Sequence, residues 1–177
     1  LDAFSPAVRE WFASSFPAPT PPQVQGWPHI GAGEHTLICA PTGSGKTLTA
    51  FLASIDRLVT QPRPDSRTHR TRVLYISPLR ALAFDIEKNL RAPLVGIGLA
   101  AERIGAPFTE PEVAMRTGDT PSNERQKLIR RPPDLLITTP ESLYLMLASR
   151  ARETLAGVET VIIDEIHALA AAKRGAH

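Results

Sequence analysis

The stretch from Ala40 to Thr47 constrains the fold of this chain more than any other. It reads Ala-Pro-Thr-Gly-Ser-Gly-Lys-Thr, which fits the spacing of a P-loop except that alanine stands where the pattern has its first glycine. Gly43 and Gly45 let successive backbone N–H groups point inward toward a polyphosphate, which a Cβ atom would hinder. Lys46 can then reach the β- and γ-phosphates, and the Thr47 hydroxyl can join the shell of a Mg²⁺ ion. We therefore predict a nucleoside triphosphate site. Its expected residues are Thr42, Gly43, Ser44, Gly45, Lys46 and Thr47.

The segments on either side of this loop fit the same prediction. Thr36–Cys39 is a short apolar run, which predicts a buried parallel strand ending at the loop and makes Cys39 a buried core thiol. From Leu48 to Val59, apolar residues recur at helical spacing, which predicts a helix starting near Lys46. The alternative is a glycine-rich turn between a strand and a helix that binds nothing.

Composition indicates a globular chain. At 177 residues, with 42% hydrophobic and 21% charged residues, it is long enough for one domain with a substantial core. No apolar run approaches the length of a membrane span, and the first residues carry no signal segment, so we expect no membrane partner. One cysteine excludes an internal disulfide framework and indicates a reducing, cytoplasmic setting.

The charge balance permits nucleic acid as a partner without establishing it. The net charge is +2 and the pI is about 9.0. Basic residues crowd one predicted loop and one predicted helix, and either solvation or phosphate contact accounts for them. The two clusters are Arg63, Arg67, Arg70 and Arg72, and Arg125, Lys127, Arg130 and Arg131.

Strand and helix signals alternate along the whole chain. We predict strands at 73–76, 112–116, 135–138 and 161–163. Helices are predicted after Ser5-Pro6, Thr20-Pro21, Ser77-Pro78, Thr120-Pro121 and Thr139-Pro140. Pro93 is expected to break or kink the helix that follows Ser77-Pro78. Because the strands show no polar alternation, we expect an α/β fold with a parallel sheet covered by helices on both faces.

The carboxyl ends of parallel strands are where α/β proteins bind ligands, and candidate residues lie there. Asp164 and Glu165 follow the last predicted strand and suit a Mg²⁺ holder and a group that orients the attacking water. The alternative is that this pair caps a helix. Gln23 matches the N6/N7 edge of adenine. Phe4, Trp11 or Phe16 could stack on that base, and we expect two of these three to be core residues instead.

Six segments together resemble a known family. Thr20-Pro21-Pro22-Gln23 resembles the Q motif of superfamily 2 helicases, and Ala40–Thr47 resembles their motif I, in which a leading alanine is usual. Ser77–Leu82, Thr117-Gly118-Asp119 and Thr138–Ser142 are similar to motifs Ia, Ib and Ic, and Asp164–His167 to motif II in its DExH form. The wording of these motifs looks most like the large helicase-related (Lhr) family.

This resemblance implies a RecA-like P-loop domain of an ATP-dependent helicase that uses ATP and Mg²⁺. It implies 3′-to-5′ translocation on single-stranded DNA and action on DNA/RNA duplexes. Lys46, Asp164, Glu165 and His167 would be catalytic, with Thr47 and Asp164 holding Mg²⁺ and His167 coupling hydrolysis to a second RecA-like domain. The implied nucleic-acid contacts, which also suit helix capping, are Pro78, Leu79, Arg80, Thr117, Gly118, Asp119, Thr139, Pro140, Glu141 and Ser142.

By the same resemblance, residues 1–177 are expected to form the first RecA-like domain, incomplete at its C-terminus and trimmed from a longer polypeptide. The second RecA-like domain, with its arginine fingers, would lie elsewhere in that polypeptide. The alternative is a nucleotide- or nucleic-acid-binding module that does not hydrolyse ATP in this form. A P-loop kinase or GTPase is disfavoured by the adjacent Asp164 and Glu165 and by Gln23.

Overall fold

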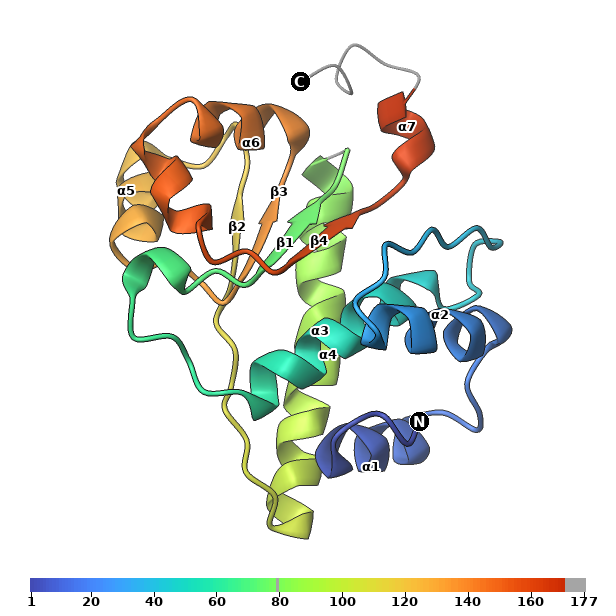
Figure 1. Ribbon diagram of the computed structural model, residues 1–177. Helices are drawn as coiled ribbons and strands as arrows, with labels where there is room; N and C mark the ends of the chain where they lie inside the picture. The colour runs from blue at the N-terminus through green and yellow to red at the C-terminus, as the bar shows by residue number, and fades with distance from the viewer. Residues whose placement is uncertain (79, 171–177) are drawn as a thin grey trace. The chain divides into compact units, whose positions relative to one another are not determined.

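The computed structural model describes residues 1–78 and 80–170, apart from the side chains of residues 80–82, 84 and 88. These residues form two compact units (Figure 1). The first unit comprises Leu1–Gln61 and Ala92–Glu110, and the second comprises Pro62–Arg91 and Pro111–His177. The long helix α4 (Arg80–Ile104) contributes residues to both units.

Helices make up the regular structure of the first unit. Besides part of α4 they are α1 (Pro6–Ser15), α2 (Pro21–Gly31) and α3 (Lys46–Thr60). Two of them begin with proline directly after Ser5 or Thr20, where the fixed φ of proline suits the first turn and its missing N–H costs nothing. The predicted starts of α1, α2 and α3 are therefore confirmed.

Aromatic side chains fill the space between α1 and α2 in the first unit. Phe4, Trp11, Phe12 and Trp27 are all buried. Trp27 packs edge-to-face against Phe4 and Phe12, with ring centroids 5.0 and 5.5 Å apart. Phe16 lies on the same cluster but is 39% exposed. Phe4 and Trp11 are thus core residues, as expected for two of the three aromatic candidates.

The predicted strand at Thr36–Cys39 is wrong for this structure. These residues have no regular secondary structure, Leu37 is 71% exposed and Cys39 is exposed as well. An apolar run gives a segment the tendency to extend, but a strand forms only where a neighbouring strand supplies the ladder hydrogen bonds. Within the described residues no strand pairs with this segment, so the expectation of a buried Cys39 fails with it.

A parallel sheet organises the second unit. Its strands are β1 (Val73–Ile76), β2 (Val113–Arg116), β3 (Leu135–Thr138) and β4 (Thr160–Ile163). Its shorter helical elements are η1 (Arg67–His69), α5 (Ser122–Arg130), α6 (Pro140–Leu147), η2 (Arg150–Leu155) and α7 (Ile166–Ala170). The strand order is β2-β3-β1-β4, and every pairing is parallel. The predicted α/β class is confirmed, and so are the four strands predicted after the phosphate loop, with ends shifted by one residue at most.

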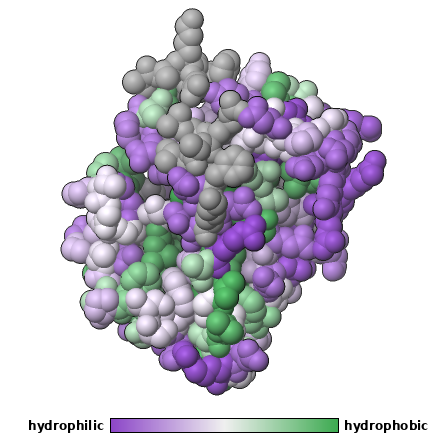
Figure 2. Space-filling view, turned by 180° about the vertical axis from the view of Figure 1, so that it is seen from behind, coloured by the Kyte–Doolittle hydropathy of each residue, from purple (hydrophilic) through white to green (hydrophobic). Residues whose placement is uncertain are grey.

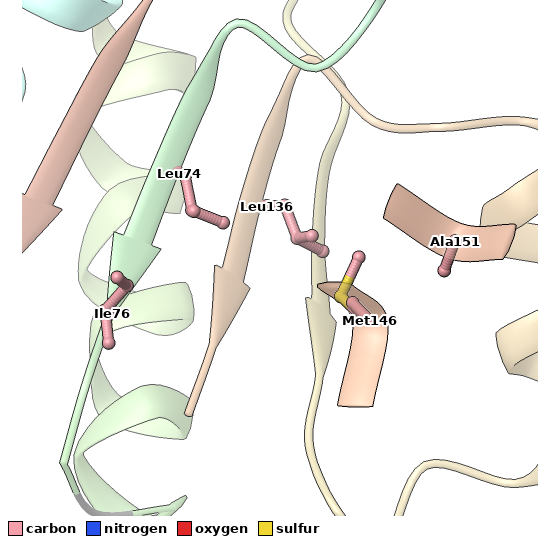
Figure 3. Close-up of a cluster of buried hydrophobic side chains, with 5 residues drawn as sticks. All are labelled: Leu74, Ile76, Leu136, Met146 and Ala151. Atoms are coloured by element: carbon pink, nitrogen blue, oxygen red, sulfur yellow. The ribbon is translucent and has the colours of Figure 1, made fainter. Parts of the chain in front are cut away.

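Both faces of the two central strands are buried. Every residue of β1 and β3 is buried. On one face, Leu74, Ile76 and Leu136 form a cluster with Met146 of α6 and Ala151 of η2. Figure 3 shows Leu74 and Leu136 projecting from the strands on the side where Met146 and Ala151 lie. The edge strand β4 is different, because Val161 and Ile163 are about half exposed.

Helix α4 runs without interruption through Pro93, so the predicted break does not occur, and the alternative of a kink there stays a prediction. Proline inside a helix removes one hydrogen bond and crowds the preceding turn. Here buried side chains flank it on both sides, because Leu90 and Leu94 are each less than 10% exposed and Ile97 is fully buried. Burial of these residues offsets the local cost of the proline.

Hydrophobic side chains also reach the surface between hydrophilic ones (Figure 2). The most exposed large ones in the described residues include Leu37, Val95 and Leu99. Even so, none of the described helices has the length and apolar character needed to cross a membrane.

A buried carboxylate ties together three segments at the amino end of the sheet. Asp134, just before β3, is 1% exposed. It accepts hydrogen bonds from Arg70 Nε at 2.8 Å and from the Glu112 N–H at 2.7 Å, and it pairs with Arg63 Nη2 at 3.2 Å. Arg131 donates to Glu112 at 2.6 Å, and this hydrogen bond lowers the pKa of Glu112. Asp134 therefore fixes the start of β2 and the segment that leads into β1.

We predict that Asp134→Ala destabilises the chain by about 3–5 kcal/mol, because it removes the buried carboxylate that pairs with two partly exposed arginines and accepts from the Glu112 N–H. The measurement is urea or thermal unfolding of the 177-residue chain. Asp65→Ala, in the exposed segment before β1, is the matched control and should change stability by less than about 0.5 kcal/mol. Equal stability of the two variants would contradict a structural role for Asp134.

Candidate functional site

The loop that leads into α3 adopts the curled conformation expected of a P-loop. Gly43 and Gly45 have φ of +79° and +84°, the left-handed region that side chains other than glycine rarely adopt. The Ser44 N–H donates to the Pro41 carbonyl at 3.3 Å, and the Lys46 ammonium group donates to the Ala40 carbonyl. The Lys46 side chain therefore reaches back over the loop to its first residue.

The start of α2 braces this loop. The Thr20 hydroxyl donates to the Ser44 carbonyl at 2.8 Å, and the Thr20 N–H donates to Gln23 Oε1 at 2.9 Å. Gln23 is 3% exposed, and a Cβ atom on Gly45 would lie 2.8 Å from its Nε2. The sequence proposed Gln23 for adenine, and the structure brings its amide against the phosphate loop. Sequence reasoning did not identify the Thr20 contact, although the Thr-Pro-Pro-Gln spacing contained the signal.

The loop suits a phosphate ligand. Among the described residues, no atom lies within 4 Å of the position that a Cβ on Gly43 would take, and none makes a hydrogen bond to the buried Ser44 Oγ. Thr47 is exposed at the start of α3 and Lys46 is partly exposed, so both are accessible to an anion. The positive end of α3 adds to the attraction.

In the second unit, Asp164 is held by two donors directly after β4. The Tyr75 hydroxyl donates to Asp164 Oδ2, and the Glu165 N–H donates to Asp164 Oδ1 at 2.9 Å. Burial and this hydrogen bond both raise the pKa of Tyr75. Glu165 has φ of +47°, a left-handed conformation that costs a non-glycine residue about 1–3 kcal/mol and is typical of functional sites.

Glu165 and His167 lie together at the start of α7. His167 Nδ1 is 3.3 Å from Glu165 Oε2, and both side chains are exposed. Two residues capable of proton transfer and charge coupling therefore contact each other beside Asp164. We find no group of three or more His, Cys, Asp or Glu side chains arranged for a metal in the described chain. Hydroxyl and carboxylate oxygens, which Thr47 and Asp164 carry in their separate units, are the kinds of ligand that Mg²⁺ prefers.

The residues predicted to contact nucleic acid follow β1, β2 and β3. Because these strands are parallel and in register, Ser77, Thr117 and Thr139 lie at one edge of the sheet. The Thr117 N–H donates to Thr120 Oγ1 at 2.9 Å, and the Ser142 N–H donates to Thr139 Oγ1 at 3.4 Å. The capping role is therefore present. Leu79 lies outside the described residues, as does the side chain of Arg80.

At least four of the eight residues in the two basic clusters form ion pairs or hydrogen bonds within the protein. Arg63 and Arg70 pair with Asp134, and Arg131 pairs with Glu112. Arg125 donates to the carbonyls of Gly118 and Thr120 at 2.6 and 2.7 Å, so it holds the loop after β2. These contacts favour a structural role for the four arginines over direct phosphate binding.

The structure thus describes two sets of candidate residues, each within its own unit. Thr42–Thr47 and Gln23 belong to the first unit, and the carboxyl edge of the sheet with Asp164 and Glu165 belongs to the second. A glycine-rich loop that ends in Lys-Thr at a helix start, and a parallel sheet with acidic residues after its last strand, are both features of P-loop nucleotide-binding proteins.

Comparison with known proteins identifies the class more closely. The chain belongs to the DEAD/DEAH box helicase family, because the sequence model of that family matches residues 20–177. It is 59% identical over its whole length to the Lhr helicase/probable uracil glycosylase of Mycolicibacterium smegmatis, and 57% identical over 99% of its length to the Lhr helicase/uracil glycosylase of Escherichia coli. The chain spans 12% of the length of each of these relatives.

The solved structures agree. The structure of the Mycobacterium smegmatis helicase Lhr bound to ssDNA and AMP-PNP superposes with a TM-score of 0.91 at 59% identity, covering 98% of this chain and 22% of that one. The predicted RecA-like fold and the resemblance to Lhr helicases are confirmed.

We predict that Gly45→Ala destabilises the nucleotide-free 177-residue chain more than Gly43→Ala. Both substitutions place alanine in a left-handed conformation at about 1–2 kcal/mol. Within the described part of the chain, the new Cβ on residue 45 alone meets other atoms, which are Gln23 Nε2 at 2.8 Å and Thr20 Oγ1 at 3.2 Å. Displacing that buried amide would also break the brace from Thr20 to Ser44.

The measurement is the unfolding midpoint of both variants beside the unsubstituted chain, with Gly43→Ala as the matched control. Equal losses in the two variants would show that Gln23 does not brace the loop.

Proposed function

We propose that this chain is the ATP-binding part of an ATP-dependent helicase that translocates 3′-to-5′ on single-stranded DNA. The observation that carries the proposal is the P-loop, curled at Gly43 and Gly45 and braced by Thr20 and Gln23. Family membership and the ligands named for the related M. smegmatis structure, ssDNA and AMP-PNP, support it.

In this proposal the P-loop residues bind the phosphates of ATP, and Gln23 reads the adenine edge. Lys46 supplies the positive charge for the β- and γ-phosphates, and Thr47 and Asp164 hold Mg²⁺. Mg²⁺ held by these residues would neutralise charge that develops on the transferred phosphoryl group. Glu165 orients the attacking water, and the strained backbone that sets its side chain supports this assignment.

The carboxyl edge of β1, β2 and β3 is proposed to hold the backbone of one nucleic-acid strand. The hydroxyl and N–H groups of Thr117, Thr139 and Ser142 are neutral, so they position phosphates without reading bases. The strand that they hold is proposed to be single-stranded DNA or one strand of a DNA/RNA duplex.

The remaining parts of the helicase are proposed to lie in a longer polypeptide. The relatives are far longer than this chain, which spans 12% of them. A second RecA-like domain would supply arginine side chains to the γ-phosphate, and His167, beside Glu165, would couple hydrolysis to its movement.

We predict that Lys46→Ala abolishes ATP hydrolysis in the full-length protein, because it removes the charge that stabilises the β- and γ-phosphates. Glu165→Gln should retain Mg-ATP binding and lose hydrolysis, whereas Asp164→Asn should weaken Mg²⁺-dependent binding. Steady-state ATPase assays and equilibrium ATP binding separate these effects.

Lys127→Ala and Glu159→Gln are exposed, charge-matched controls and should leave both measurements unchanged. Wild-type turnover in the Lys46 variant would refute the assignment of the P-loop. Loss of ATP binding in the Glu165 variant, with unchanged turnover per bound ATP, would show that the roles of the acidic pair are wrongly assigned.

We also predict that residues 1–177 alone bind ATP weakly and show no DNA-stimulated hydrolysis. An arginine aimed at the γ-phosphate from a second domain contributes roughly 10³ to 10⁵ in rate in related enzymes. The test is a steady-state ATPase assay on the chain with and without single-stranded DNA, with the full-length protein as positive control. Clear stimulation of the chain by DNA would contradict the two-domain mechanism.

A further inference from the structure

Tyr75, the third residue of β1, places a hydroxyl group in the buried part of the sheet. The residue is 1% exposed, and the other residues of the strand are buried and apolar. A buried hydroxyl costs free energy unless it forms a hydrogen bond, so the acceptor it contacts indicates why a tyrosine stands at this position. The Tyr75 hydroxyl donates to Asp164 Oδ2, across 89 positions of the sequence.

The register of two paired strands brings these side chains together. Strands β1 and β4 lie next to each other (Figure 1), with Tyr75 in register with Ile162. Asp164 comes two residues after Ile162, and side chains two apart along an extended chain point to the same face of a sheet. The Asp164 N–H donates to the Ile76 carbonyl at 3.0 Å, so the parallel pairing continues as far as Asp164.

Two donors hold the carboxylate of Asp164, which is partly exposed. Its Oδ2 accepts from the Tyr75 hydroxyl, and its Oδ1 accepts from the Glu165 N–H at 2.9 Å. Because each oxygen has a donor of its own, turning the carboxylate breaks at least one hydrogen bond. An ionised carboxylate has about four lone-pair sites, so each oxygen keeps one for a further ligand. The carboxylate is therefore fixed in orientation and still able to bind a cation.

We propose that Tyr75 is a positioning residue that holds the Asp164 carboxylate in the orientation that Mg²⁺ requires. This inference rests on the proposed function, in which Asp164 holds Mg²⁺. The ion demands nearly ideal octahedral geometry, so a ligand that is oriented beforehand binds it at a lower cost than a ligand that must first be ordered. Tyr75 acts through Asp164 and needs no contact with the ion itself.

The alternative is that this hydrogen bond only ties the end of β4 to β1. Tyr75→Phe separates the two interpretations, because it removes the hydroxyl and keeps the buried ring. If the bond is only a tie between strands, the variant loses stability and Mg²⁺ tightens nucleotide binding as much as before. If Tyr75 positions Asp164, the effect of Mg²⁺ becomes smaller, and it does so only while residue 164 carries a carboxylate.

The experiment measures equilibrium binding of a fluorescent, non-hydrolysable ATP analogue to the full-length protein, in EDTA and in excess Mg²⁺. The ratio of the two Kd values states how much the ion tightens binding, without any turnover. We expect Tyr75→Phe to lower this ratio about tenfold, because replacing a hydrogen-bonded partner of a metal ligand typically weakens metal binding roughly 10- to 100-fold. The Kd in EDTA should stay unchanged, since the P-loop does not depend on Tyr75.

Two further variants complete the test. Asp164→Asn gives the reference loss, and adding Tyr75→Phe to it should lower the ratio no further, because the two residues act through one hydrogen bond. Tyr144→Phe removes the hydroxyl of the chain's other tyrosine, which is exposed on α6, and should leave the ratio unchanged.

The outcomes separate this inference from the proposed function. An unchanged ratio in Tyr75→Phe would overturn the role of Tyr75 alone, and so would the same additional loss when Asp164→Asn is already present. If Asp164→Asn itself leaves the ratio unchanged, the proposed Mg²⁺ role of Asp164 fails, and the Tyr75 inference falls with it.

Discussion

Parallel pairing of four short strands is the constraint on which the second unit depends. Because β2, β3, β1 and β4 run the same way in register, the residue after each strand lies at one edge of the sheet. Ser77, Thr117, Thr139 and Asp164 are far apart in sequence and meet there for that reason alone. The other edge carries the structural charges, with Asp134 fixing the approach to β1 and the start of β2. The residues proposed to bind ligands and the buried charges that stabilise the fold therefore lie at opposite ends of the same strands.

In the first unit, the phosphate loop depends on a helix start that lies about twenty residues earlier. A glycine-rich loop is flexible. If such a loop becomes ordered only when the anion binds, the cost of ordering it reduces the free energy of binding, so a loop that is ordered beforehand binds the anion more tightly. The hydrogen bond from Thr20 to Ser44 and the packing of Gln23 against Gly45 provide that order. The amide therefore has a role in the protein without nucleotide as well as the role proposed for it with adenine.

How much of this could be predicted from the sequence depends on the range of the forces involved. Helix starts at Pro6, Pro21 and Pro140 depend on local chemistry and were predictable, as were apolar strands such as Leu135–Thr138. The segment Thr36–Cys39 has the same local pattern, but a strand needs a partner, and its residues carry no information about whether one is available. At Pro93 the local signal predicted a helix break that does not occur, because burial of the surrounding side chains outweighs the local cost of the proline.

The candidate site shows the same division. Motif spacing identified Lys46, Asp164 and Glu165 as candidates, because the residues next to each of them in the sequence form a recognisable motif. It did not identify Tyr75 beside Asp164 or Arg125 across the loop after β2, because those contacts join residues 89 apart and up to seven apart through the fold. Arg116 directly precedes the segment that resembles motif Ib, yet only its burial without a partner among the described residues distinguishes it from an ordinary surface arginine.

The exposure of Cys39 has a practical consequence. It is the one cysteine of the chain, and it immediately precedes the first residue of the phosphate loop. A thiol in contact with solvent reacts readily with alkylating reagents, whereas one enclosed in apolar surroundings is inert. The rate of alkylation at Cys39 therefore reports on the surroundings of the segment that leads into the loop, and a fluorophore attached there would follow the loop in solution without any engineered residue.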